Sequence, residues 1–278
     1  MDRNQELKGK VAIVTGAGAA AGIGIVVART LAEGGAQVVL TGRREQELND
    51  LTDGLKKDGL DVACVLADMN EPDSIESIVK FTVDTYGKVN VLINNAALTG
   101  HPKDTDVEHQ DPEVWDAIFK TNARGTMLMT KYAIPEMRKA GGGSIINISS
   151  GQSMAGDMQY TAYACTKGAI NTLTKFVATQ YADDHIRCNA LILGLVHTGV
   201  GEKTMPEAVR NILLANKLSG RLGTGEDIAE FVRFLSSDNS SWITGQELGI
   251  DGGFFAHQPT TAPFKELMAK MAAAQNRA

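Results

Sequence analysis

The chain has little cysteine, no long apolar run and no excess of positive charge. Only three of its 278 residues are cysteines, an odd number that is too small for a disulfide framework and is typical of a reducing compartment. No run approaches the roughly 18 apolar residues that a membrane span needs, and residues 1–10 hold no apolar stretch of signal-peptide length. These absences exclude a secreted disulfide-rich miniprotein and a membrane protein, and they predict a cytoplasmic location.

The charge balance is mildly acidic. Lys and Arg number 27 against 33 Asp and Glu, so the formal net charge is −6. Such a chain has no electrostatic reason to coat nucleic acid or anionic lipid, and we expect neither as a partner. Hydrophobic residues make up 43% and charged residues 22%, which excludes a disordered chain. No group of His, Cys and Asp has metal-ligand spacing, so we expect no metal site.

Short β-branched segments alternate with longer stretches of helical periodicity. The predicted strands lie at 10–15, 36–41, 61–66, 90–95, 143–149, 186–193 and 245–251. The predicted helices lie near 22–34, 44–58, 72–86, 112–140, 160–182 and 225–237. This alternation predicts an α/β fold, a doubly wound parallel β-sheet flanked by helices on both faces (the Rossmann fold). We expect caps at Asp111, before Pro112, and at Thr224 with Asp227.

The chain has no linker or repeat that would divide it. We therefore predict a single domain over residues 1–253, with a small substrate lobe near 195–224 and a C-terminal tail at 254–278. In the tail, one helical face would carry Phe264, Leu267, Met268 and Met271. We expect this apolar stripe to pack on the body of its own chain; covering a neighbouring subunit is the alternative.

A glycine-rich turn follows the first predicted strand, in the segment TGAGAAAGIG at residues 15–24. Glycine lets the backbone approach a pyrophosphate closely, and the helix that follows offers unpaired N–H groups to the phosphates. The turn therefore predicts a dinucleotide site that includes Gly16, Gly18, Gly22, Ile23 and Gly24. The alternative is a glycine-rich turn that serves packing alone.

The end of the second predicted strand bears on which dinucleotide is bound. An acidic residue there would bind the adenosine ribose hydroxyls and favour NAD, but the chain has Gly42, then Arg43 and Arg44. A guanidinium suits a ribose 2′-phosphate, so Arg43 favours NADP(H), with NAD(H) as the alternative. Arg43 could instead begin a solvated helix face. Asp68, after the third strand, could reach the adenine amino group or cap the next helix.

The region after the fifth predicted strand carries the chemistry. Tyr163 is the only tyrosine with a lysine, Lys167, four residues later, and at this spacing both share one helix face. Ser150 lies 13 residues before Tyr163. Together with further segments, these residues resemble the short-chain dehydrogenase/reductase family over residues 8–253. The further segments are the glycine turn, NNAA at 94–97, NARG at 122–125 and SSWITGQELGIDGG at 240–253.

The resemblance implies an NAD(P)(H)-dependent oxidoreductase, a ketoreductase that interconverts a carbonyl and a secondary alcohol. It makes Tyr163 the general acid and base, while Ser150 donates a hydrogen bond to the substrate oxygen. A lysine ammonium about 4 Å away is worth roughly 4 kcal/mol at an effective dielectric near 20. We therefore expect Lys167 to lower the pKa of Tyr163 and also to hold the nicotinamide ribose.

The resemblance also implies supporting roles. Asn122 would hold a water that links Lys167 to solvent, and Asn95 would support the sheet and the adenosine side of the cofactor. Val196 and Thr198 match the segment that binds the nicotinamide carboxamide. Members of the family are commonly homotetramers, so we expect a homo-oligomer.

The chain departs from the family pattern at three places. Five residues, in place of three, separate Gly16 from Gly22, as in the divergent enoyl-carrier-protein reductases. Those enzymes place six residues between tyrosine and lysine, and this chain has three, so a carbonyl-reducing enzyme is favoured. The extra alanines stand where many NADP-preferring members have a basic residue. Ala97 replaces a glycine, and Leu193-Gly194 replaces Pro-Gly.

Substrate contacts are expected from the loops that follow the fifth and sixth strands. Gln152, Tyr160 and His197 are the predicted contacts, and Met154 and Met158 are predicted pocket wall. This mixture predicts a medium-sized, partly polar carbonyl or secondary alcohol. The alternative function is a catalytically weak cofactor-sensing protein on the same fold. Such a sensor would need the glycine turn and would not need Tyr163.

Overall fold

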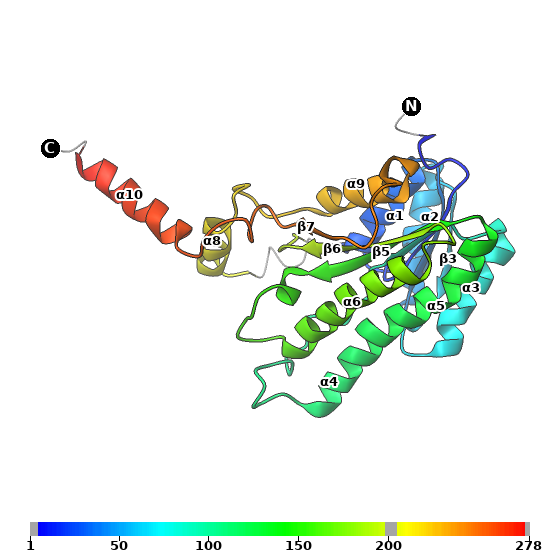
Figure 1. The fold of residues 1–278 in the computed structure, drawn as a ribbon, viewed down its shortest axis with the longest axis horizontal. Coiled ribbons are helices and arrows are strands. Elements are labelled where there is room, and N and C mark those ends of the chain that lie inside the picture. The colour runs from blue at the N-terminus through cyan, green and yellow to red at the C-terminus, as the bar shows by residue number, and fades with distance from the viewer. Residues whose placement is uncertain (1–4, 198–204, 276–278) are drawn as a thin grey trace.

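A parallel sheet forms the centre of the molecule. The computed structural model describes residues 5–197 and 205–275, and within them seven strands lie in the order β3-β2-β1-β4-β5-β6-β7 (Figure 1). The strands are β1 (Val11–Val14), β2 (Gln37–Gly42), β3 (Val62–Leu66), β4 (Val91–Asn94), β5 (Gly143–Ser150), β6 (Ile186–Leu193) and β7 (Glu247–Ile250). Every neighbouring pair is parallel. The predicted doubly wound sheet is confirmed, with its order reversing between β1 and β4.

Helices cover both faces because the strands are apolar on both. Val14, Leu40 and Ile146 face one core cluster, whose other side is formed by α1 (Ile23–Glu33), α2 (Glu45–Lys57) and α9 (Gly225–Ser236). Ile13, Leu92 and Ile145 face the second cluster, which α3 (Pro72–Tyr86), α5 (Gly125–Lys139) and α6 (Thr161–Gln180) cover. Alternate residues of β1 thus enter opposite cores, as the pleat of a strand requires.

The predicted helix at 112–140 is interrupted. It consists of α4 (Pro112–Phe119), a π-helical turn at Lys120–Arg124, and α5. Asp111 caps α4, since its side chain accepts a hydrogen bond from Glu113 N at 3.0 Å. The predicted capping box of Thr224 and Asp227 begins α9. Within the described residues, no helix combines the length and hydropathy that crossing a bilayer requires.

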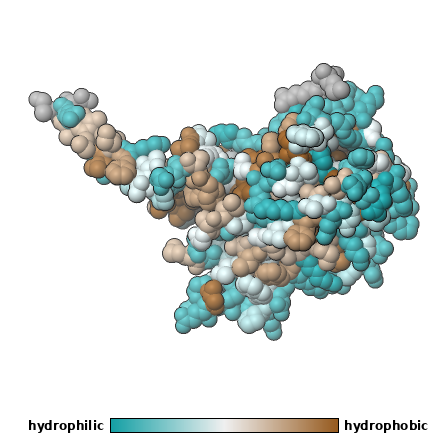
Figure 2. Space-filling model, viewed as in Figure 1, coloured by the Kyte–Doolittle hydropathy of each residue, from teal (hydrophilic) through white to brown (hydrophobic). Residues whose placement is uncertain are grey.

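The lobe and the tail extend beyond the sheet. Helix α8 (Glu207–Ala215) lies in the range predicted as a substrate lobe, and α10 (Thr261–Gln275) projects away from the body (Figure 1). The expectation that the stripe of α10 packs on its own chain is wrong. Its four apolar side chains, Phe264, Leu267, Met268 and Met271, are 51–64% exposed, and Figure 2 shows apolar surface on this helix. The preceding segment, residues 251–260, carries α10 past α8 and out of reach of the sheet.

Candidate active site

The glycine turn brings the backbone of β1 close to the end of β4. Gly16 has a φ of +69°, and a Cβ on it would lie 2.7 Å from Ala96 Cα. A Cβ on Gly24 would lie 2.7 Å from both Asn95 Nδ2 and Gly16 O. Packing alone therefore requires glycine at these two positions. The support for a phosphate site comes from α1, which begins after Gly22 without a side-chain cap and so offers its first N–H groups to an anion.

Asn95 ties the two turns together. Its Nδ2 donates to Thr15 O at 2.8 Å and to Gly16 O at 3.2 Å, and its backbone N donates to Thr15 Oγ1 at 3.0 Å. The supporting position predicted for Asn95 is therefore consistent with its contacts. Ala97 costs no backbone strain in place of glycine, because Tyr160 and His185 are the only described non-glycine residues with positive φ.

The residues predicted to meet the adenosine lie around the end of β2. Gly18 packs against Gly42, whose Cβ, if present, would lie 3.0 Å from Gly18 Cα. Arg43 is exposed, whereas Arg44 donates to Gly18 O at 2.9 Å. Asp68 Oδ1 accepts hydrogen bonds from the backbone and the side chain of Asn70, both at 2.9 Å. Asp68 thus organises the turn before α3, where Glu71 is the N-cap residue.

The structure brings Ser150, Tyr163 and Lys167 together at the end of β5 and the start of α6. Ser150 acts on the Tyr163 hydroxyl in the direction that favours the phenolate, and so opposes the rise in its pKa. Lys167 is 2% exposed, and its Nζ lies 5.4 Å from the centroid of the Tyr163 ring. The same Nζ donates to Ile148 O at 2.7 Å. This grouping offers a substrate oxygen two hydroxyl donors, with a cation behind them.

The expected lowering of the Tyr163 pKa is not found. Burial raises the pKa of Tyr163 above its ordinary value of 10, although the hydrogen bond with Ser150 opposes this. Burial also lowers the pKa of Lys167 to about 8. The ammonium lies over the ring and binds a backbone carbonyl, so desolvation outweighs its attraction for a phenolate. The phenol therefore keeps its proton at neutral pH, as a proton donor must.

Asn122 lies in the π-helical turn and faces α6. Its Oδ1 accepts from Leu98 N at 2.7 Å, and its Nδ2 donates to Leu98 O at 3.1 Å and Thr166 Oγ1 at 3.2 Å. Thr166 Oγ1 in turn donates to Tyr163 O at 2.7 Å. Asn122 therefore links the segment after β4 to α6. Its role in holding a water stays a prediction.

Asp104 is a residue of the site that the sequence did not reveal. It is 2% exposed, and its carboxylate accepts hydrogen bonds from Ala162 N at 2.9 Å and Tyr163 N at 3.0 Å. Helix α6 begins after Tyr160, which has a φ of 64° and supplies no side-chain cap. The cap thus comes from a residue 59 positions before Tyr163, and no local sequence pattern signals such a pair.

The predicted substrate contacts lie in the segments that follow β5 and β6. Gln152 N donates to Ser150 Oγ at 3.3 Å, and Tyr160 N donates to Asp104 O at 3.0 Å. His197 N donates to Gly223 O at 2.6 Å, and Val196 forms a bridge with Gly223. Thr198 lies outside the described residues. Met154 and Met158 are 55% and 84% exposed, so the predicted pocket wall is open here.

Phe255 is a second residue that the sequence analysis missed. A Cβ on Gly151, directly after Ser150, would lie 2.5 Å from the Phe255 ring. The backbone N of Phe255 donates to Asp251 Oδ2 at 2.9 Å, which holds this segment after β7. Because residues 254–278 were interpreted as a tail, the sequence analysis did not place Phe255 beside Gly151. No local sequence pattern signals this contact, because Gly151 and Phe255 lie far apart in the sequence.

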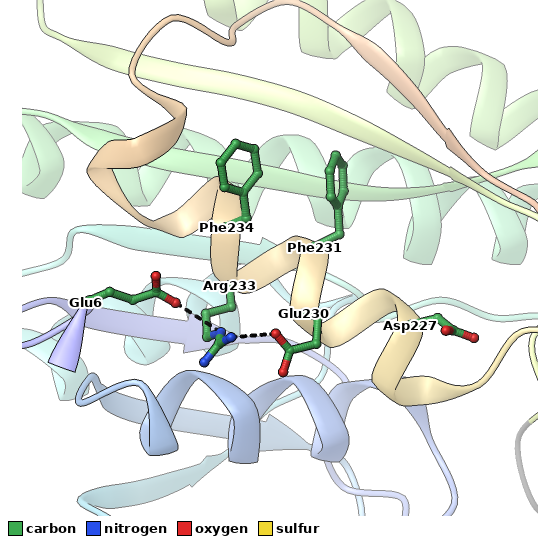
Figure 3. Close-up of a pocket in the computed structure, with 6 residues that line it drawn as sticks. All are labelled: Glu6, Asp227, Glu230, Phe231, Arg233 and Phe234. Atoms are coloured by element: carbon green, nitrogen blue, oxygen red, sulfur yellow. Dashed lines mark hydrogen bonds and ion pairs between the residues drawn. The ribbon is translucent and has the colours of Figure 1, made fainter. Parts of the chain in front are cut away.

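A pocket on α9 lies apart from these residues. Figure 3 shows Arg233 between Glu6 and Glu230, with Arg233 Nε 3.0 Å from Glu6 Oε1, while Phe231 and Phe234 point to one side. The ion pair with Glu6 holds the N-terminal segment on α9. Among the described residues, no cluster of three or more His, Cys, Asp or Glu could hold a metal ion.

Comparisons with known proteins find relatives over nearly the whole chain. A family model described as Enoyl-(Acyl carrier protein) reductase matches residues 16–255. The 7alpha-hydroxysteroid dehydrogenase of Bacteroides fragilis is 35% identical over 251 residues, which are 90% of this chain and 96% of that protein. The 3-oxoacyl-[acyl-carrier-protein] reductase FabG of Thermotoga maritima is 36% identical over 249 residues, 89% of this chain and 98% of that protein.

A solved structure is similar over nearly the whole chain. It is a gluconate 5-dehydrogenase from Burkholderia cenocepacia in complex with NADP and tartrate. The TM-score is 0.85 at 29% sequence identity, over 92% of this chain and 99% of that one.

Proposed function

This chain belongs to the short-chain dehydrogenase/reductase family, NAD(P)-dependent oxidoreductases that act on alcohol and carbonyl groups, and we propose that Tyr163 is its general acid and base. The observation that carries the proposal is the grouping of Ser150 and the partly buried Tyr163 with the buried Lys167. The nicotinamide, when bound, supplies or accepts the hydride. The residues of the chain then have to position the substrate oxygen and move one proton.

Each residue has a separate task. In reduction, the Tyr163 hydroxyl donates its proton to the carbonyl oxygen as negative charge develops there. The Ser150 hydroxyl donates a hydrogen bond to the same oxygen and stabilises that charge. Lys167, with its pKa lowered to about 8, stays largely protonated at neutral pH and favours the phenolate that is left behind. Asn122 holds α6 against the segment after β4 and is the residue proposed to bind the relay water.

The reacting bond is a carbonyl in this proposal, although the family model is described as an enoyl reductase. Three residues separate Tyr163 from Lys167, which places both on one face of α6. The B. fragilis and T. maritima relatives are named as a hydroxysteroid dehydrogenase and an oxoacyl reductase. Both names describe a carbonyl and alcohol pair.

We propose NADP(H) as the favoured cofactor, with NAD(H) as the alternative. Gly42 leaves no acidic side chain at the end of β2, and the exposed Arg43 is free to meet a 2′-phosphate. The related gluconate 5-dehydrogenase structure contains NADP. The dinucleotide would lie against the glycine turn, and Lys167 would hold the nicotinamide ribose.

The substrate proposed is a medium-sized, partly polar ketone or secondary alcohol. The named relatives act on a steroid, an oxoacyl group and gluconate at 29–36% identity, so no one of these substrates is favoured by similarity. We expect Gln152, beside Ser150, to supply polar groups to the substrate together with Tyr160 and His197, and we expect Phe255, beside Gly151, to add an aromatic wall.

The test is an activity matrix of NADPH and NADH against a panel of ketones and alcohols at two pH values. We expect a substrate-dependent change in nicotinamide absorbance, larger with NADPH, and an oxidative rate that rises with pH because a phenolate is then the base. Tight cofactor binding without turnover across the panel would contradict the proposal and favour the sensor.

We also propose a homo-oligomer, a tetramer as is common in the family. An isolated helix of 15 residues is marginal in water, and the apolar face of α10 is exposed in the single chain. A second copy would cover it. Light scattering should give the mass of a tetramer, reduced in Leu267→Asp; a monomeric native protein would contradict this.

A further inference from the structure

The cofactor loop is fastened to the start of α2 by one carboxylate and one guanidinium. Glu47 Oε1 accepts a hydrogen bond from Ala20 N at 3.1 Å, and Arg44 Nε lies 2.9 Å from Glu47 Oε2. Arg44 Nη2 donates to Gly18 O at 2.9 Å. The carboxylate therefore lies between a backbone N–H of the glycine loop and a guanidinium that follows β2.

These two donors form an anion site that the chain fills with its own side chain. A backbone N–H and a guanidinium are groups that bind phosphate oxygens. Their position matters, because in this fold the end of the second strand meets the adenosine ribose. Arg44 comes two residues after Gly42, the last residue of β2. The donors nearest to a ribose 2′-phosphate are thus occupied by Glu47.

We propose that Glu47 is a specificity-determining residue that competes with the adenosine 2′-phosphate. Its carboxylate repels the phosphate and retains Arg44, so it reduces the preference for NADP(H) that Arg43 and Arg44 create. NAD(H), which has a hydroxyl at this position, meets no such competition. The inference rests on the proposed function, since it requires a dinucleotide in this site.

The hydrogen bond from Ala20 N to Glu47 distinguishes this arrangement from an ordinary surface ion pair. Arg44 and Glu47 are three residues apart at the start of α2, and their side chains are 64% and 34% exposed. A pair of that kind contributes little to stability. Ala20 is 27 residues from Glu47, however, and belongs to the alanine segment that lengthens the loop. The lengthened loop thus brings its N–H to the carboxylate.

The probes are ADP and 2′,5′-ADP, which differ in the 2′-phosphate that Glu47 would oppose. Their dissociation constants are measured by calorimetry for the native protein, Glu47→Gln and Glu45→Gln. The Glu47→Gln side chain keeps an oxygen for Ala20 N and loses the charge. Glu45 is the matched control, because it is exposed in the same helical turn and makes no hydrogen bond or ion pair that the structure describes.

We expect Glu47→Gln to strengthen the binding of 2′,5′-ADP relative to that of ADP by about fivefold. This is the size of effect expected when one like charge at contact distance in water is removed. Glu45→Gln should change the ratio less than twofold. An equal change in both variants, or no change in Glu47→Gln, would overturn the inference alone. Failure of the native protein to bind either nucleotide would overturn the proposed function and this inference with it.

Discussion

Two regions border the carboxyl ends of the strands, and they are built differently. The side chains that hold the catalytic helix are buried, with Asn122 0% and Asp104 and Lys167 each 2% exposed. The helices of the lobe and the tail, α8 and α10, contain no buried residue in the part of the chain that the structure describes. Burial fixes the position of the proposed proton donor, whereas α8 and α10 lie in exposed segments, which tolerate change.

Replacing Asp104 should give the largest effect on the buried region. Asp104→Ala leaves the N–H groups of Ala162 and Tyr163 unpaired, so we expect a loss of about 3 kcal/mol in the free energy of unfolding. Because these groups set the place of Tyr163, kcat/KM should fall at least tenfold. Chemical denaturation and steady-state kinetics measure the two effects.

Asp111→Ala is the matched control, because Asp111 caps α4 in the same way. The free energy of unfolding of Asp111→Ala should fall by about 1 kcal/mol, and its kcat should be unchanged. If the two variants lost activity equally, Asp104 would have no special relation to Tyr163.

The buried lysine makes stability depend on pH. The pKa of Lys167 is about 8 in the folded protein and has its ordinary value of 10.5 in the unfolded chain. Between these values the unfolded chain binds a proton that the folded protein has released, so the free energy of unfolding rises with pH. The rise should be about 2 kcal/mol from pH 8 to 9.5. Above pH 10 the raised pKa of Tyr163 acts in the opposite direction.

Lys167→Met should remove this rise, and Lys175→Met, on the exposed side of the same helix, should keep it. Urea unfolding at several pH values makes the comparison. A rise of equal slope in Lys167→Met would show that another group causes it.

The fold and the centre of the site could be predicted because their signals are local. Apolar strands alternate with amphipathic helices, Asp111 caps its own helix, and Tyr163 lies one turn from Lys167. Asp104, Glu47 and Phe255 could not be predicted in this way, since each acts on a residue far away in the sequence. The π-helical turn at 120–124 leaves no break in the helical pattern. The apolar stripe of α10 is a local pattern and could be recognised in the sequence. The surface that would cover such a stripe cannot be identified from a local pattern, and the prediction that it packs on its own chain is wrong.

The smallest effect is expected in the exposed region. Phe255→Ala removes the ring from Gly151. Phe255 is 41% exposed, so the loss should be near 1 kcal/mol of substrate binding, about a fivefold rise in KM. Neither kcat nor the free energy of unfolding should change much. A fall in kcat with unchanged KM would show that Phe255 acts on the reaction step, as the buried residues do. This result would contradict the contrast between the two regions.

The proton donor itself is tested most directly by single-turnover kinetics of Tyr163→Phe with saturating NADPH and the best ketone of the panel. Phenylalanine keeps the ring over which the Lys167 ammonium lies and removes the hydroxyl on which Ser150 acts. We expect nicotinamide oxidation to slow by about 10²–10⁴-fold, with the NADPH dissociation constant changed less than threefold, while Tyr181→Phe at the far end of α6 reacts at the native rate. A Tyr163→Phe protein that reacts as fast as the native enzyme would contradict the account.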